Sequence, residues 1–147
     1  MKILVAVDLS PAAQPVLEQA RLLATAFRAQ IWLLHVAEPD PAFVGFEADS
    51  KVMRDLTAEH FHDEHRGLQA MADQLRQAGL DCTALLIQGA TVETILQEAQ
   101  RLGVDMIVTG SHGKGKMQRL LLGSVSEGLL HESTVPVHLV PTRDITT

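Results

Sequence analysis

The sequence contains no tyrosine and one tryptophan, and aromatic residues make up 3% of its 147 residues. With so few aromatic rings, the chain lacks the stacking surface on which proteins bind single-stranded nucleic acid. Its net charge of −6 also disfavours a nucleic-acid duplex, because duplex binding requires a basic face that releases counterions. We therefore expect no nucleic-acid partner.

Cysteine and long apolar runs are equally scarce. The single cysteine, Cys82, excludes an intramolecular disulfide and indicates a reducing compartment. Asp8 interrupts the N-terminal apolar run, which is then too short for the apolar region of a signal peptide. No run approaches the roughly 18 apolar residues that a membrane-spanning helix needs. We expect a cytoplasmic protein with no membrane partner and a buried, inert Cys82.

Apolar strand-like runs alternate with amphipathic helical segments along the whole chain, whose length is that of one domain. This alternation is typical of a parallel sheet with helices on both faces. The sequence predicts a single doubly wound α/β domain over residues 1–147, with five strands in the order 3-2-1-4-5. Strands are expected at residues 3–7, 31–36, 82–87, 105–109 and 135–140, and helices at 10–29, 50–78, 92–102 and from 123.

Four of the ten glycines lie between Gly110 and Gly123, directly after the predicted fourth strand. Their spacing is Gly110, two residues, Gly113, nine residues and Gly123, followed by Ser124. Glycines let main-chain N–H groups approach a ligand, and the helix that follows adds unpaired donors and positive charge. The pattern predicts a loop that binds a polyphosphate. The same loop carries three cationic side chains, those of Lys114, Lys116 and Arg119.

The same stretch nearly matches the P-loop motif, because Gly110, Gly115 and Lys116 have the required spacing. Met117, however, stands where that motif needs the Ser or Thr that ligates Mg²⁺, and no helix begins there. We therefore do not expect a P-loop NTPase.

The predicted sheet binds its ligand beyond the carboxyl ends of strands one and four, which carry Asp8 and Gly110. The Asp8 carboxylate can accept hydrogen bonds from ribose or a base, or hold Mg²⁺ through water, or form an Asx turn or an acidic helix cap. Ser124 and Ser126 fall in the first turn of the last helix, where they can contact phosphate or cap the helix. His112 is either a phosphate donor or a solvated loop residue.

His60, His62 and His65 raise the question of a metal site, but only His62 and His65 share a helix face. Two histidines bind zinc only with added ligands such as Glu59, so a solvated helix face is the preferred interpretation. No nucleophile, base and carboxylate can be placed together from the sequence, and no catalytic residue is assigned.

These motifs resemble the universal stress protein family, and the similarity extends over the whole chain. It rests on the opening Ile3-Leu4-Val5-Ala6-Val7-Asp8 followed by Ser10, on Leu34-His35-Val36, on Gly110-Ser111-His112-Gly113 with Gly123-Ser124-Val125-Ser126, and on Val135-Pro136-Val137. In that family this loop distinguishes members that bind ATP, so the resemblance implies the ATP-binding branch. Leu9 replaces a glycine that is common in the family, which would narrow the pocket mouth. Ser126 stands where threonine is also common.

The resemblance also implies particular contacts. Adenosine would be surrounded by Ala6, Asp8 and Val36, with Val36 recognising adenine through its main chain. Ribose and phosphates would be held by Gly110, His112, Gly113, Gly123, Ser124, Val125 and Ser126. The family's usual dimer, joined through the last strand, fits the stretch from Val135 to Val140, which is otherwise an unpaired edge.

We interpret the chain as an ATP-binding, homodimeric stress-response protein that senses or regulates through an unidentified protein partner. Its ligand would be ATP, alone or with Mg²⁺, and turnover would be slight because the loop supplies binding groups but no evident general base. Two alternatives stay open. One is a slow ATPase or adenylate-forming enzyme of the related α/β group, and the other is a nucleotide-free interaction module.

Overall fold

The computed structural model describes residues 1–39, 50–112 and 122–142, with side chains omitted for residues 50–57. Among these residues, five parallel strands form one sheet in the order β3-β2-β1-β4-β5, which confirms the predicted doubly wound fold. The strands are β1 (Lys2–Ala6), β2 (Gln30–Ala37), β3 (Cys82–Gln88), β4 (Met106–Gly110) and β5 (Val137–Val140). The helices are α1 (Ala13–Phe27), α2 (Ser50–Gln77), α3 (Thr91–Leu102) and α4 (Ser124–Glu132).

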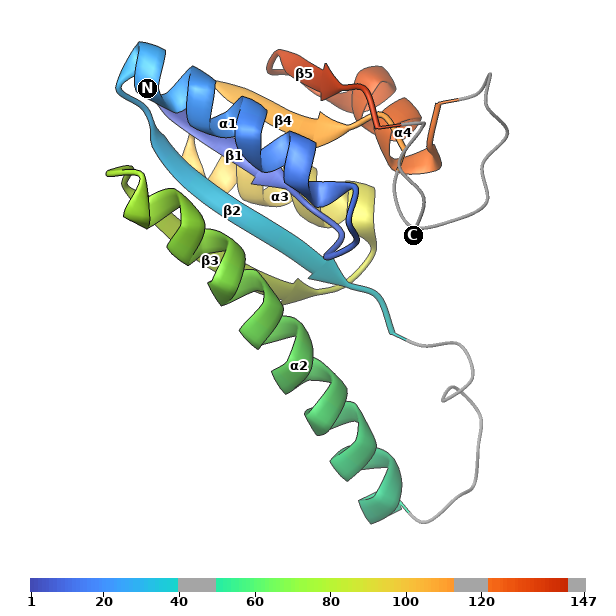
Figure 1. The fold of residues 1–147 in the computed structure, drawn as a ribbon. Coiled ribbons are helices and arrows are strands. Elements are labelled where there is room, and N and C mark those ends of the chain that lie inside the picture. Colours follow the sequence, from blue (N-terminus) through green and yellow to red (C-terminus); the bar gives the residue numbers. More distant parts are fainter. Residues whose placement is uncertain (40–49, 113–121, 143–147) are drawn as a thin grey trace.

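Helices cover both faces of this sheet (Figure 1). Successive residues of the inner strands point to opposite faces: Val5 and Leu33 pack with α1 and α2, whereas Leu4 and Leu34 pack with α3 and α4. A strand that is covered on both faces must be apolar at nearly every position. The uninterrupted apolar runs of β1 and β2 therefore follow from their central place in the sheet.

The predicted helix bounds lie within two residues of the observed ones, except at the start of α1. Gly79 and Gly103 follow α2 and α3 with φ angles of 85° and 64°, the left-handed conformation that ends a helix. Helix α1, in contrast, begins at Ala13 rather than at Ser10. The Ser10 hydroxyl accepts a hydrogen bond from the Ala12 N–H at 3.2 Å, so Ser10 stabilises a turn that precedes the helix.

The last strand is shorter than predicted, because β5 begins at Val137 and not at Val135. Pro136 still contributes to the sheet, since its carbonyl accepts a hydrogen bond from the Ile107 N–H of β4 at 2.9 Å. Among the described residues, β5 pairs only with β4 and forms one edge of the sheet.

Cys82 is buried in β3, as predicted, with 5% of its surface exposed. Burial raises the pKa of its thiol to about 11. Because the thiolate is the reactive form, this side chain is inert at neutral pH.

In the part of the chain that the structure describes, no helix is both long and apolar enough to cross a membrane.

Leu9 adopts a left-handed backbone conformation, with φ of 61°. For a residue other than glycine this conformation costs roughly 1–2 kcal/mol. Its side chain packs against the core between the sheet and α1 and α2, and faces Gly67. It does not line the cavity described below, so the expectation that Leu9 narrows the pocket mouth is wrong. A glycine at this position would adopt the positive φ without that cost.

We expect Leu9→Gly to be more stable than Leu9→Ala by about 1 kcal/mol, because both lose the same packing and only glycine relieves the left-handed φ. Denaturant unfolding followed by circular dichroism measures the difference. Leu23 of α1 packs against the same core in a helix and is the matched control. Within this helix, Leu23→Ala should be more stable than Leu23→Gly by about 1 kcal/mol. If the glycine variant is the more stable at both positions, or the alanine variant at both, the prediction is contradicted.

Candidate functional site

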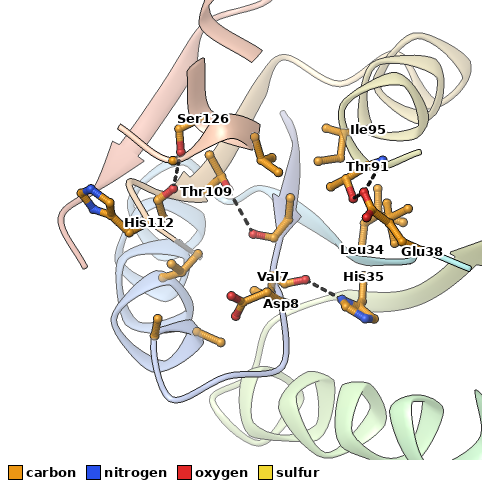
Figure 2. A pocket seen from close by; sticks show the side chains of 18 of the residues that line it. Val7, Asp8, Leu34, His35, Glu38, Thr91, Ile95, Thr109, His112 and Ser126 are labelled. Carbon is orange, nitrogen blue, oxygen red and sulfur yellow. Dashed lines mark hydrogen bonds between the residues drawn. The ribbon is translucent and has the colours of Figure 1, made fainter. Parts of the chain in front are cut away.

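A cavity of about 480 Å³ lies beyond the carboxyl ends of β1, β2 and β4, where the winding of the sheet reverses (Figure 2). Its volume falls in the range of roughly 300–1,000 Å³ that is common for small-molecule sites. Nine of the ten residues predicted to contact a ligand line it, and the tenth, Gly113, lies outside the described residues together with Lys114, Lys116, Met117 and Arg119. The nine are Ala6, Asp8, Val36, Gly110, His112, Gly123, Ser124, Val125 and Ser126.

Other walls of the cavity come from helices that the sequence analysis did not assign to the site. Ala13 and Val16 of α1 and Thr91 and Ile95 of α3 all line it. Ala13, Val16 and Ile95 are apolar, and the spacing that marks them as helical also marks them as core. Thr91 is polar, but its contact with Glu38 depends on where α3 begins in space. Only the packing of the helices therefore reveals the place of these residues at the cavity.

The two carboxylate oxygens of Asp8 differ in their hydrogen bonds. Its Oδ1 accepts hydrogen bonds from the N–H and the hydroxyl of Ser10 at 3.0 and 2.6 Å, which is the Asx turn. Its Oδ2 is buried and has no hydrogen-bond partner among the residues that the structure describes. An unpaired buried acceptor is costly. Asp8 therefore combines a structural role with an atom that can accept a hydrogen bond from a ligand.

Three helices begin at the cavity, and their N-termini differ in charge. Asp8 precedes α1, and at α3 the Glu38 carboxylate accepts a hydrogen bond from the Thr91 hydroxyl at 2.6 Å. Helix α4 has Gly123 at its N-cap and no side-chain cap. The acidic residue of its first turn is Glu127, whose side chain is 63% exposed and therefore screened by solvent. A helix N-terminus attracts anions. The start of α4 is therefore the part of the cavity most favourable to a phosphate.

Ser124 and Ser126, both in the first turn of α4, have different surroundings. Ser126 is buried, and its hydroxyl donates to the Gly110 carbonyl at 2.7 Å. A hydroxyl has one proton, so this bond engages the only one that Ser126 can donate. Ser126 thus ties α4 to the end of β4. Ser124 is exposed at the cavity, and its hydroxyl is the better placed of the two for a ligand.

Beside Asp8, His35 of β2 bridges two elements. Its Nδ1 lies 2.8 Å from the Val7 carbonyl and its Nε2 lies 2.9 Å from Glu64 of α2. Because a carbonyl only accepts, Nδ1 donates to Val7, and Nε2 faces the Glu64 carboxylate. Glu64 also contacts His60 at 2.6 Å. The cavity carboxylates of Glu38 and Glu64 are thus engaged in holding elements together.

The described residues contain no group of three or more His, Cys, Asp or Glu side chains arranged to hold a metal ion. His60 instead pairs with Glu64, while the side chains of His62 and His65 are exposed on α2.

The fold is that of a doubly wound α/β protein, with a cavity at its switch point whose α4 end favours anions. Residues 1–141 match the model of the universal stress protein family, and the chain belongs to that family. It is 34% identical over 140 residues to a universal stress protein of Thermus aquaticus, a match that covers 94% of this chain and 96% of the relative.

Two solved structures share the fold. Universal stress protein MJ0577 of Methanocaldococcus jannaschii superposes with a TM-score of 0.82 at 27% identity, covering 95% of this chain and 94% of that one. A universal stress protein family member from Arabidopsis thaliana, solved with AMP bound, superposes with a TM-score of 0.67 at 22% identity, covering 96% and 91% of the two chains.

Proposed function

We propose that this chain is an ATP-binding, homodimeric stress-response protein that senses or regulates and turns over little or no ATP. The observation that carries the proposal is the cavity, where nine residues that the family resemblance assigns to nucleotide contact meet from β1, β2, β4 and α4. The AMP complex of the Arabidopsis relative supports an adenine nucleotide as the ligand class.

The charges around the cavity give the nucleotide a direction. Figure 2 shows His112 and Ser126 on one side, Ile95 and Glu38 on the other, and Asp8 between them. Phosphates would lie at the uncapped start of α4, because the carboxylates at α1 and α3 repel them. The unpaired Oδ2 of Asp8 would accept a ribose hydroxyl, and the apolar side near Ile95 would hold the base.

Slight turnover follows from the same contacts. A general base must have a free lone pair beside the attacking water. Glu38 lies on the side of the cavity away from His112 and Ser126 (Figure 2), and Glu64 is held by His35 and His60. The remaining carboxylate oxygen, Asp8 Oδ2, is the one that we assign to the ribose. Bound ATP would therefore persist and mark a state that a protein partner in the cytoplasm reads.

Calorimetry with ATP and adenosine, together with phosphate release at saturating ATP and Mg²⁺, tests this proposal. We expect micromolar or tighter ATP binding, much weaker adenosine binding, and release far below the enzymatic range of about 1–10³ s⁻¹. Asp8→Asn is the informative variant, since its amide oxygen can still accept from Ser10. A wild-type rate above about one per second that Asp8→Asn abolishes while ATP still binds would instead indicate an enzyme. If ATP binds no more tightly than adenosine, the proposed phosphate contacts at the start of α4 are contradicted.

A further inference from the structure

The segment that follows β5 is bonded to the start of the glycine loop through Thr142. This side chain is buried, with 3% of its surface exposed. Its hydroxyl accepts a hydrogen bond from the His112 N–H at 3.0 Å and donates one to the His112 carbonyl at 2.8 Å. The Thr142 N–H donates to the Ser111 hydroxyl at 3.1 Å, and the Ser111 N–H donates to the Val140 carbonyl at 2.8 Å. A single hydroxyl thus holds both main-chain polar groups of His112.

Gly110 provides the room for this arrangement. A Cβ at this position would lie 3.2 Å from Thr142 Cγ2 and 3.4 Å from the His112 carbonyl oxygen. Gly110 does not have a positive φ, so its backbone conformation does not require glycine. What matters at this position is the space left by the absent side chain. The first glycine of the motif therefore serves the contact with Thr142 as well as the cavity wall.

We propose that Thr142 is a positioning residue for the phosphate end of the cavity, an inference that rests on the proposed nucleotide function. Thr142 does not line the cavity, whereas Gly110 and His112 both do. The hydroxyl acts through His112: by fixing its N–H and carbonyl, it sets the direction in which the chain leaves β4 toward the glycine loop. The adenosine end, formed by β1, β2 and α3, has no hydrogen bond to Thr142 among the described residues.

Thr142→Val keeps the shape of the side chain and removes the hydroxyl. It removes both hydrogen bonds between the Thr142 hydroxyl and the main chain of His112. The loss of about one hydrogen bond between the displaced chain and phosphate then corresponds to roughly tenfold in affinity. We expect ATP affinity to fall about tenfold, and adenosine affinity, measured by competition, to change less than about twofold. Thr142→Ser should bind both ligands as the wild type does, because it restores the hydroxyl.

Thr25→Val is the matched control, because it removes an exposed hydroxyl that donates to the Arg21 carbonyl of α1. Amide hydrogen exchange provides a readout without nucleotide: the His112 N–H should exchange faster in Thr142→Val than in Thr142→Ser or Thr25→Val.

Equal ATP affinity in the wild type and Thr142→Val would overturn this inference and leave the proposed function intact. Equal losses for ATP and adenosine would also overturn it, since they would indicate a general effect on the fold. If the wild type binds no ATP, the proposed function and the positioning role both fail.

Discussion

Gly123→Val is expected to weaken ATP binding by about a hundredfold or more, the largest effect of any single change at the cavity. Gly123 is the N-cap of α4, is buried, and donates its N–H to the Ser111 carbonyl at 2.9 Å. Its φ and ψ of −61° and 152° are open to valine without backbone strain. The variant therefore tests whether a side chain blocks the phosphate, and not whether the backbone needs glycine. The branched side chain would enter the region where phosphate approaches the helix.

Ser124→Ala tests the same end of the cavity more gently. A hydrogen bond to a charged group contributes roughly 1.5–3 kcal/mol, so its loss should weaken ATP binding about ten- to a hundredfold. Ser133→Ala is the control, because that hydroxyl lies at the opposite end of α4 and bonds to the Val135 carbonyl. Calorimetry gives the affinities, and thermal unfolding shows whether each variant is folded. Unchanged affinity in Gly123→Val would remove the start of α4 from the site.

The strand positions and the parallel, doubly wound class of the sheet were predictable because they depend on local patterns and on the hand of the connections, whereas these patterns do not fix the strand order. Continuous apolar runs identify buried parallel strands, and the connections between them are nearly always right-handed. The start of α1 was less predictable. Ser10 is a good helix cap, but its contacts with Asp8 and Ala12 stabilise a turn instead, and the sequence does not reveal which alternative wins.

The contacts that shape the cavity were beyond sequence reasoning because they join residues far apart in the chain. Thr142 and His112 are 30 positions apart, and Glu38 and Thr91 are 53 apart. Each pair depends on where two separate segments end in space. Leu9 is a related case, since its departure from the family glycine was visible but its left-handed φ was not. The roles of the nine cavity residues toward a ligand stay predictions.

The outer edge of β5 offers main-chain groups to a second copy of the chain. The carbonyls of Pro136 and Val140 accept hydrogen bonds from N–H groups on the β4 side. Because residues of a parallel strand alternate in the direction of their main-chain groups, Val137 and Leu139 direct theirs away from β4. An N–H at position 136 would point toward β4. Its absence in Pro136 therefore removes no hydrogen-bond donor from the outer edge of β5. Val137 packs against the core between the sheet and α3 and α4, so lysine there would damage the fold.

Leu139→Pro is consequently the sharper test of the proposed dimer, and we expect it to be monomeric where the wild type is dimeric. Proline removes an N–H that faces away from β4, a position at which edge strands tolerate it, so the protein should stay folded by circular dichroism. Leu139→Ala keeps the N–H and should remain dimeric, which separates main-chain pairing from side-chain packing. Sedimentation at high micromolar concentration, with and without ATP, measures the outcome. A monomeric wild type in both conditions, or a dimeric Leu139→Pro, would refute pairing through β5.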